Sequence, residues 1–164
     1  LDHGVPVIVA HCASLGDGVD LDKGANGPMV DNFDLFTRMM DEPRYEGKLF
    51  GDISAITQIN RLGRPLTTLL QREEWHSRLL NGSDFPLRGV MPLFSVSEMA
   101  AQGYLDAKWV EPISALRHYI PLLFDFVLKR HLAVDGKSFE KRVFETGRTF
   151  ENLGNKIKMK VEKV

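Results

Sequence analysis

The stretch Leu79-Leu80-Asn81-Gly82-Ser83-Asp84-Phe85-Pro86 decides the fold that this sequence predicts. An apolar run ends in a Gly-Ser-Asp-aromatic-Pro turn, which places an acidic side chain where a buried strand leaves its sheet. The upstream stretch Val5-Pro6-Val7-Ile8-Val9-Ala10-His11 has the same design and ends in a histidine. Two strand ends that carry metal-binding, proton-transferring side chains predict one shared site.

Strand and helix patterns alternate between these two stretches. Apolar runs over residues 5–11, 48–56 and 78–83 predict three strands buried on both faces, as in a parallel sheet. Asp31 is placed to cap one intervening helix, and Pro65 suits the first turn of the next. The strand ends at His11, Ser54 and Asp84 lie 43 and 30 residues apart. One (β/α)8 barrel unit averages about 30 residues, and the extra length of the first interval lies in the loop after His11. The sequence therefore predicts an α/β fold.

Helices are expected after Asp84. Ser95 and Glu98 have capping-box spacing, and Pro121 breaks a helix predicted over residues 111–132. A final amphipathic helix is predicted over 138–152, and the tail 155–164 is typical of an edge strand or a frayed end. No linker divides the chain, so we expect one domain over 1–164, with barrel strands and helices in 5–90 and a helical region in 91–164.

Composition narrows the class of protein. With 43% hydrophobic and 26% charged residues among 164, the chain can bury one core, and its net charge of -1 gives no electrostatic case for nucleic acid or an anionic membrane. The single cysteine, Cys12, excludes an intrachain disulfide and a Cys-based zinc cluster. Without a membrane segment or secretory signal, the expected location is cytoplasmic. Because Leu1 lies just before a core strand, we expect a piece of a longer protein.

Three residues are candidates for the site. Asp84 is either a metal ligand and general base or a turn residue that bonds nearby backbone amides. His11 is either a ligand or a structural histidine, and its position at a second strand end favours function. Ser54 lies near the end of the strand between them and is a candidate for substrate contact. A long polar loop over 12–30 is expected to face the substrate.

These motifs resemble the amidohydrolase superfamily of metal-dependent hydrolases, in the branch that also contains non-oxidative decarboxylases. The segment Val7-Ile8-Val9-Ala10-His11-Cys12-Ala13-Ser14 is similar to its strand six, Phe50-Gly51-Asp52-Ile53-Ser54-Ala55 looks like strand seven, and Leu80-Asn81-Gly82-Ser83-Asp84-Phe85-Pro86 is similar to strand eight. The resemblance implies the C-terminal part, about strands 6–8, of a (β/α)8 TIM barrel followed by C-terminal helices. It also implies that His11 and Asp84 bind a divalent metal, zinc first, and that Asp84 is the general base.

The sequence departs from this family in its ligand set. The His-x-His pair of strand one, the bridging residue of strand four and the histidine of strand five have no counterpart here. Because a catalytic zinc takes three protein ligands, we expect a missing N-terminal barrel half, in the same protein or a separate chain, to complete the site. The predicted function is a metal-dependent hydrolase of small carbonyl, ester or amide substrates. A decarboxylase on the same site and a non-catalytic half-barrel interaction module are the alternatives, and homo-oligomers remain open.

Overall fold

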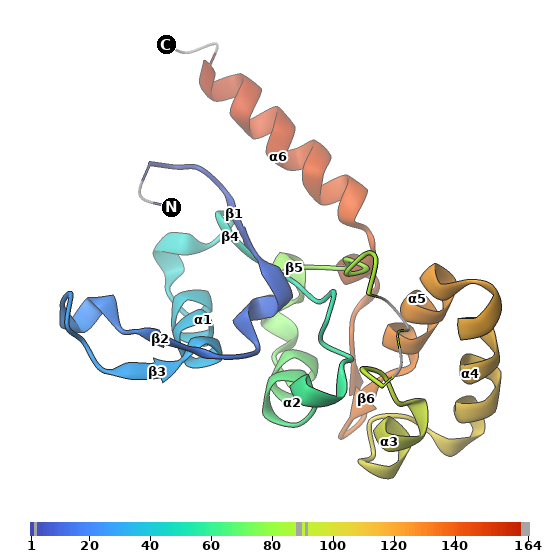
Figure 1. Cartoon of the computed structure of the whole chain (residues 1–164). Helices are drawn as coiled ribbons and strands as arrows, with labels where there is room; N and C mark the ends of the chain where they lie inside the picture. Colours follow the sequence, from blue (N-terminus) through green and yellow to red (C-terminus); the bar gives the residue numbers. More distant parts are fainter. Residues whose placement is uncertain (2, 88–89, 91, 162–164) are drawn as a thin grey trace.

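The centre of the structure is an open three-stranded parallel sheet (Figure 1). The computed structural model describes residues 1, 3–87, 90 and 92–161. The strands are β1 (Val7–Val9), β4 (Leu49–Asp52) and β5 (Leu79–Leu80), with β4 in the middle. Val7 of β1 is in register with Leu49 of β4, and Gly51 of β4 with Leu79 of β5. All three strands therefore end at the same edge of the sheet.

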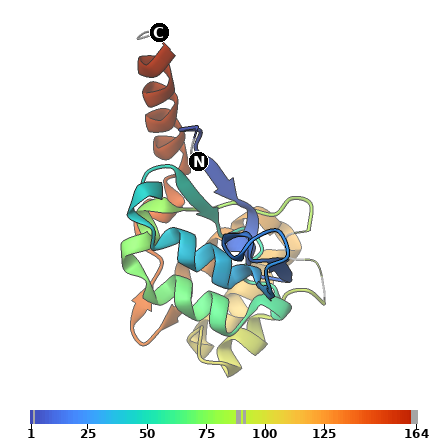
Figure 2. The same ribbon diagram turned by 90° about the vertical axis from the view of Figure 1, so that its left-hand side faces the viewer.

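Helices and two short hairpins surround this sheet. The helices are α1 (Asn32–Met40), α2 (Arg64–Gln71), α3 (Val96–Ala101), α4 (Val110–Tyr119), α5 (Pro121–His131) and α6 (Thr146–Val161). The hairpins are antiparallel pairs, β2 (Asp17–Val19) with β3 (Met29–Asp31) and β6 (Ala133–Val134) with β7 (Lys137–Ser138). Helix α6 extends away from the rest of the molecule in both views (Figures 1 and 2).

Local sequence signals set the helix starts. The Asp31 carboxylate accepts a hydrogen bond from the Phe33 amide at 2.7 Å, and the Ser95 hydroxyl accepts one from the Glu98 amide at 3.1 Å. Both residues thus satisfy backbone donors that a first helical turn leaves without partners. Helix α4 ends at Tyr119 and Pro121 begins α5, with only Ile120 between them, so the predicted break is confirmed.

The core lies where helices α1 and α2, which run side by side in Figure 2, meet the sheet. The fully or almost fully buried side chains there are Phe33, Phe36, Met40, Leu49, Ile53, Leu66, Leu69, Leu70, Trp75 and Leu79. The Phe36 and Trp75 rings pack edge to face, with centroids 6.4 Å apart. A second part of the same core joins Phe94 to Phe124 of α5. This packing fixes the strand ends that carry the candidate residues.

The prediction that this chain is the C-terminal part, about strands 6–8, of a (β/α)8 TIM barrel is wrong. Closing a barrel takes a full ring of tilted strands, whereas the described chain forms three parallel strands and two small antiparallel sheets. Beyond β5, the Asn81 amide donates to the Val143 carbonyl at 2.9 Å, so a one-turn 3-10 helix (Lys141–Phe144) lies beside the strand end. The chain is a small α/β domain.

Other segments also differ from the sequence predictions. The polar loop over 12–30 contains the β2–β3 hairpin, whose backbone pairs with itself. The helix predicted over 138–152 is split into the 3-10 turn and α6, and α6 continues as helix where an edge strand or frayed end was expected; residues 162–164 lie outside the described part. Strand β1 is not buried on both faces, because Val7 and Ile8 stay exposed at the sheet edge.

No helix in the described part of the chain combines the length and apolar character needed to cross a bilayer.

Candidate functional site

The backbone turns sharply just after β1 and just after β5. His11, Cys12 and Ala13 have φ angles of 55°, 51° and 50°, and Asp84 has a φ of 51°. These left-handed conformations are uncommon for residues with a side chain, and they cluster at functional sites where packing holds them in place. His11 therefore does not end the strand as predicted but lies two residues beyond it, within a 3-10 segment (Ala10–Ala13).

The structure brings all three candidate residues together at the carboxyl edge of the sheet. The Nδ1 atom of His11 lies 2.7 Å from the Ser54 hydroxyl, and its Nε2 atom lies 3.7 Å from Oδ1 of Asp84. The His11 and Asp84 side chains keep 30% and 17% of their surface exposed, so both remain reachable from solvent. Ser54 is buried behind the histidine, where its hydroxyl is occupied by protein partners rather than facing a substrate.

Asp52, at the end of β4, completes the support of the histidine. Its Oδ1 atom accepts hydrogen bonds from the Ser54 amide at 2.9 Å and from the Ser54 hydroxyl. Since the hydroxyl has one proton and gives it to Asp52, the ring of His11 must donate from Nδ1 to Ser54. In the neutral ring Nε2 then carries a lone pair, which faces a carboxylate oxygen of Asp84. Two acceptors in this arrangement favour a cation or a proton donor between them.

Asp84 is oriented by a neighbour that sequence reasoning missed. Gln58 donates from Nε2 to Oδ2 of Asp84 at 3.1 Å, and the other oxygen, Oδ1, is the one nearer to His11. Arg61, one turn further along, donates from Nε to the Gln58 amide oxygen at 3.4 Å and from Nη1 to the Ser14 hydroxyl at 2.8 Å. Burial lowers the pKa of Arg61, while the carboxylates of Asp84 and Asp52 raise it.

A buried ion pair lies beneath the turn that carries Asp84. Lys129 of α5 is fully buried, and its ammonium donates to Oδ2 of Asp125 at 2.8 Å and to the Gly82 carbonyl at 2.7 Å. Burial lowers the pKa of Lys129, and the nearby carboxylates, Asp125 first and then Asp52 and Asp84, oppose that effect. The ammonium thus fixes the backbone two residues before Asp84 and places a positive charge below the site.

Some of the missed residues carried a signal in the sequence. Asp52 is the last residue of β4, and His11 and Asp84 lie shortly after the ends of β1 and β5. This common position at strand ends could have identified Asp52. Asp125 and Lys129 are spaced i,i+4 within an otherwise apolar helix, a spacing that suits a pair. Gln58 and Arg61 carried no such signal, because the partners that tie them to the site, Asp84 and Ser14, lie far away along the chain.

The donor set is suited to a metal ion but is not complete. Imidazole nitrogen and carboxylate oxygen are both zinc ligands, with metal–ligand distances of about 2.0–2.2 Å. A separation of 3.7 Å between His11 Nε2 and Asp84 Oδ1 therefore allows both atoms to bind one ion. Within the described residues, no three or more His, Cys, Asp or Glu side chains are grouped to hold a metal. Two of the side chains predicted to bind a metal, His11 and Asp84, thus lie within reach of one ion.

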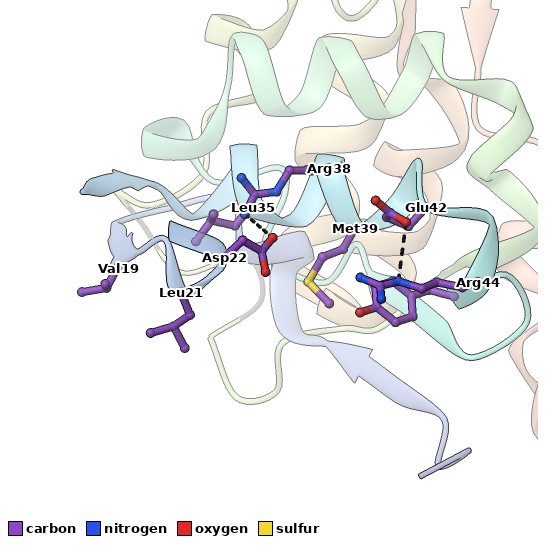
Figure 3. A pocket seen from close by; sticks show the side chains of 9 residues that line it. Val19, Leu21, Asp22, Leu35, Arg38, Met39, Glu42 and Arg44 are labelled. Atoms are coloured by element: carbon purple, nitrogen blue, oxygen red, sulfur yellow. Dashed lines mark ion pairs between the residues drawn. The ribbon is translucent and has the colours of Figure 1, made fainter. Parts of the chain in front are cut away.

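A depression lies away from the sheet edge, between the β2–β3 hairpin and α1 (Figure 3). Its volume is about 220 Å³, and its charged side chains are paired with each other: Arg38 with Asp22, and Arg44 with Glu42. Arg38 also binds Asp20 through two hydrogen bonds of 2.7 and 2.8 Å. Because these charged side chains already pair with each other, they are less available to bind a ligand than the side chains at the sheet edge.

Comparison of the chain with protein-family models, with curated proteins and with solved structures yields no match, so the geometry of the sheet edge is what bears on function.

Proposed function

We propose that the carboxyl edge of this sheet is the site of a metal-dependent hydrolase, with a chemistry like that of the amidohydrolases its motifs resemble. The supporting observation is that the lone pair of His11 Nε2 and Oδ1 of Asp84 face each other across 3.7 Å. Open parallel sheets bind ligands at the carboxyl ends of their strands, so an open sheet supports this location as a barrel would.

The residues of this chain have distinct roles in the proposal. His11 offers Nε2 to the ion, and Ser54 with Asp52 holds its ring in the required tautomer. Asp84 would hold the ion and accept a proton from the attacking water, while Gln58 keeps its Oδ2 atom in place. A divalent ion bound there would polarise a small ester, amide or other carbonyl substrate and acidify its bound water.

The ion needs at least one more protein ligand than the described residues supply. A catalytic zinc site has three protein ligands and one open position. We propose that the further donor comes from another segment of the protein or from a second chain. The expected affinity of this chain alone for zinc is correspondingly weak.

Zinc titration tests this function without requiring the true substrate. After chelator treatment, the chain should bind one Zn²⁺ by isothermal titration calorimetry. His11→Ala and Asp84→Asn should each weaken that binding at least about tenfold, and Ser54→Ala, which removes a support of the ring, should weaken it by about tenfold. His118→Ala is the matched control, because His118 is exposed on α4, away from the cluster.

A second readout addresses the reaction. Added Zn²⁺ should accelerate hydrolysis of p-nitrophenyl acetate by the wild type, and Asp84→Asn should remove the acceleration. Equal zinc binding by wild type, His11→Ala and Asp84→Asn would contradict the proposed ligands. Zinc binding that is normal but never accelerates hydrolysis in this chain, or accelerates it equally in Asp84→Asn, would contradict the assigned role of Asp84.

A further inference from the structure

Arg61 lies at the site, and its side chain is bonded to neutral groups. It ends a 3-10 turn (Ile59–Arg61), and its two hydrogen bonds go to neutral acceptors, the Ser14 hydroxyl and the Gln58 amide oxygen. Ser14 donates its backbone amide to the His11 carbonyl at 3.0 Å, and Gln58 donates to Asp84. Arg61 is therefore linked through one intermediate residue to each of the two proposed metal ligands.

Several arginines elsewhere on the molecule are neutralised by carboxylates. Arg38 binds Asp20 in a bidentate pair, and Arg64 and Arg72 form ion pairs with Asp34 and Asp41. Arg61 makes no ion pair with any carboxylate in the part of the chain that the structure describes, and its Nη2 group has no hydrogen bond there. Two nitrogens of the Arg61 guanidinium, Nε and Nη1, are hydrogen-bonded, and Nη2 has unused donors. Part of this planar group is therefore open to a ligand.

The surroundings of Arg61 are unusual for a solvated surface charge. Burial is the largest influence on its pKa and lowers it, which means that the guanidinium has lost hydration. Losing hydration without gaining a carboxylate partner is costly for a charged group, and a bound anion would repay that cost. Guanidinium forks match the planar geometry of a carboxylate and bind it through charge-assisted hydrogen bonds.

We infer that Arg61 binds a carboxylate group of the substrate, so that the site acts on small organic acids that also carry a hydrolysable bond. The hydrolytic part of this inference rests on the proposed function, whereas the binding of a carboxylate to Arg61 does not. In this arrangement Arg61 orients the acid, and the reacting carbonyl lies toward His11 and Asp84.

The charge around the site predicts how this binding depends on metal. Without a metal, the carboxylates of Asp52 and Asp84 outnumber the single guanidinium, and Lys129 is already paired with Asp125. A divalent ion reverses the local sign and should strengthen carboxylate binding. Arg61 should contribute under both conditions, because its donors are independent of the ion.

Nuclear magnetic resonance titration with benzoate and benzamide tests the inference. The two probes have the same ring, but benzoate carries a negatively charged carboxylate and benzamide a neutral amide. Benzoate should shift the Arg61 Nε–Hε resonance and the Gln58 side-chain amide, more tightly with Zn²⁺ than without it, while benzamide should bind at least tenfold more weakly. Arg61→Gln should weaken benzoate binding at least tenfold, Arg61→Lys less, and Arg148→Gln, on α6, should have no effect.

The outcomes separate this inference from the proposed function. Benzoate binding that depends on Arg61 in a chain that binds no zinc supports the carboxylate site and overturns the metal proposal. Normal zinc binding with no Arg61-dependent benzoate binding overturns the inference alone. Equal binding of benzoate and benzamide, or unchanged benzoate affinity in a folded Arg61→Gln variant, also overturns it.

Discussion

Cys12 shows how closely the site is built onto the core. Its side chain is fully buried directly after His11, and its thiol donates to the Asp52 carbonyl with an Sγ–O distance of 3.1 Å. Burial, and then the negative charge of Asp52, raises the pKa of this thiol well above its usual value. The residue is therefore a small buried thiol, and its reactivity is suppressed rather than activated.

The raised pKa predicts a pH dependence of stability. In the unfolded chain Cys12 ionises at about pH 8.5, while in the folded protein it stays protonated. Its contribution to the free energy of unfolding is thus complete below that pH and is lost as the pH rises toward the folded-state value, by at most about 1.4 kcal/mol per pH unit. Urea unfolding between neutral and alkaline pH should show a steeper loss for the wild type than for Cys12→Ala.

A reagent assay gives an independent check on the same thiol. In the native protein, Cys12 should react with the disulfide reagent dithiobis(nitrobenzoate) only at the rate of global or local opening. Unfolding in urea should expose one reactive thiol per chain. Parallel pH profiles for wild type and Cys12→Ala, or rapid labelling of the native protein, would show that the thiol is accessible and ionisable in the fold.

At the scale of elements, β4 packs closely at Gly51 against Cys12 and Phe36. A Cβ atom built on Gly51 would lie 2.7 Å from Sγ of Cys12 and 2.7 Å from Cζ of Phe36, so strand, 3-10 turn and α1 meet without room for a methyl group. We predict that Gly51→Ala lowers the free energy of unfolding by about 1–3 kcal/mol through overpacking. Gly154→Ala, at an exposed position of α6 with nothing within 4 Å, should leave stability equal or raise it by about 0.5–1 kcal/mol. Urea midpoints that fall equally in both variants would contradict this explanation.

Elements whose signals are local could be predicted from the sequence, and those set by distant contacts could not. Asp31, Ser95 and Pro121 act on their own neighbourhoods, and the helix boundaries near them were correct. The closeness of His11 and Asp84 was also predicted, because parallel strands end at one edge. Whether alternating strands and helices close into a barrel or stay open is decided by long-range pairing, which leaves no local pattern.

The same reasoning applies to the supporting residues of the site. Lys129 reaches Gly82 from a helix that follows much later in the chain, and Arg61 reaches Ser14 across a similar gap. Sequence periodicity reports which face of a helix is apolar, and a buried lysine on that face is an exception to it. The roles of residues such as Lys129 and Arg61 can be proposed only once the three-dimensional structure shows their partners.

At the scale of the whole molecule, β1 is an edge strand with apolar side chains on the surface. Val5, Val7 and Ile8 are 61%, 38% and 40% exposed, and within the described residues no strand pairs with the outer side of β1 (Figure 1). Such edges present backbone donors and acceptors that can pair with another strand. Two copies related by a two-fold axis could pair their β1 strands in antiparallel fashion and cover these side chains.

We therefore predict that the chain self-associates through β1 as its concentration rises. Sedimentation velocity should show a weight-average sedimentation coefficient that increases with concentration for the wild type and stays constant for Ile8→Lys, because a lysine on an edge strand opposes pairing. Leu122→Lys is the control, since it places the same charge on exposed α5 and should leave the association unchanged. Loss of association in Leu122→Lys instead would assign the contact to the α4–α5 surface, and a wild type that remains monomeric throughout would contradict the edge pairing.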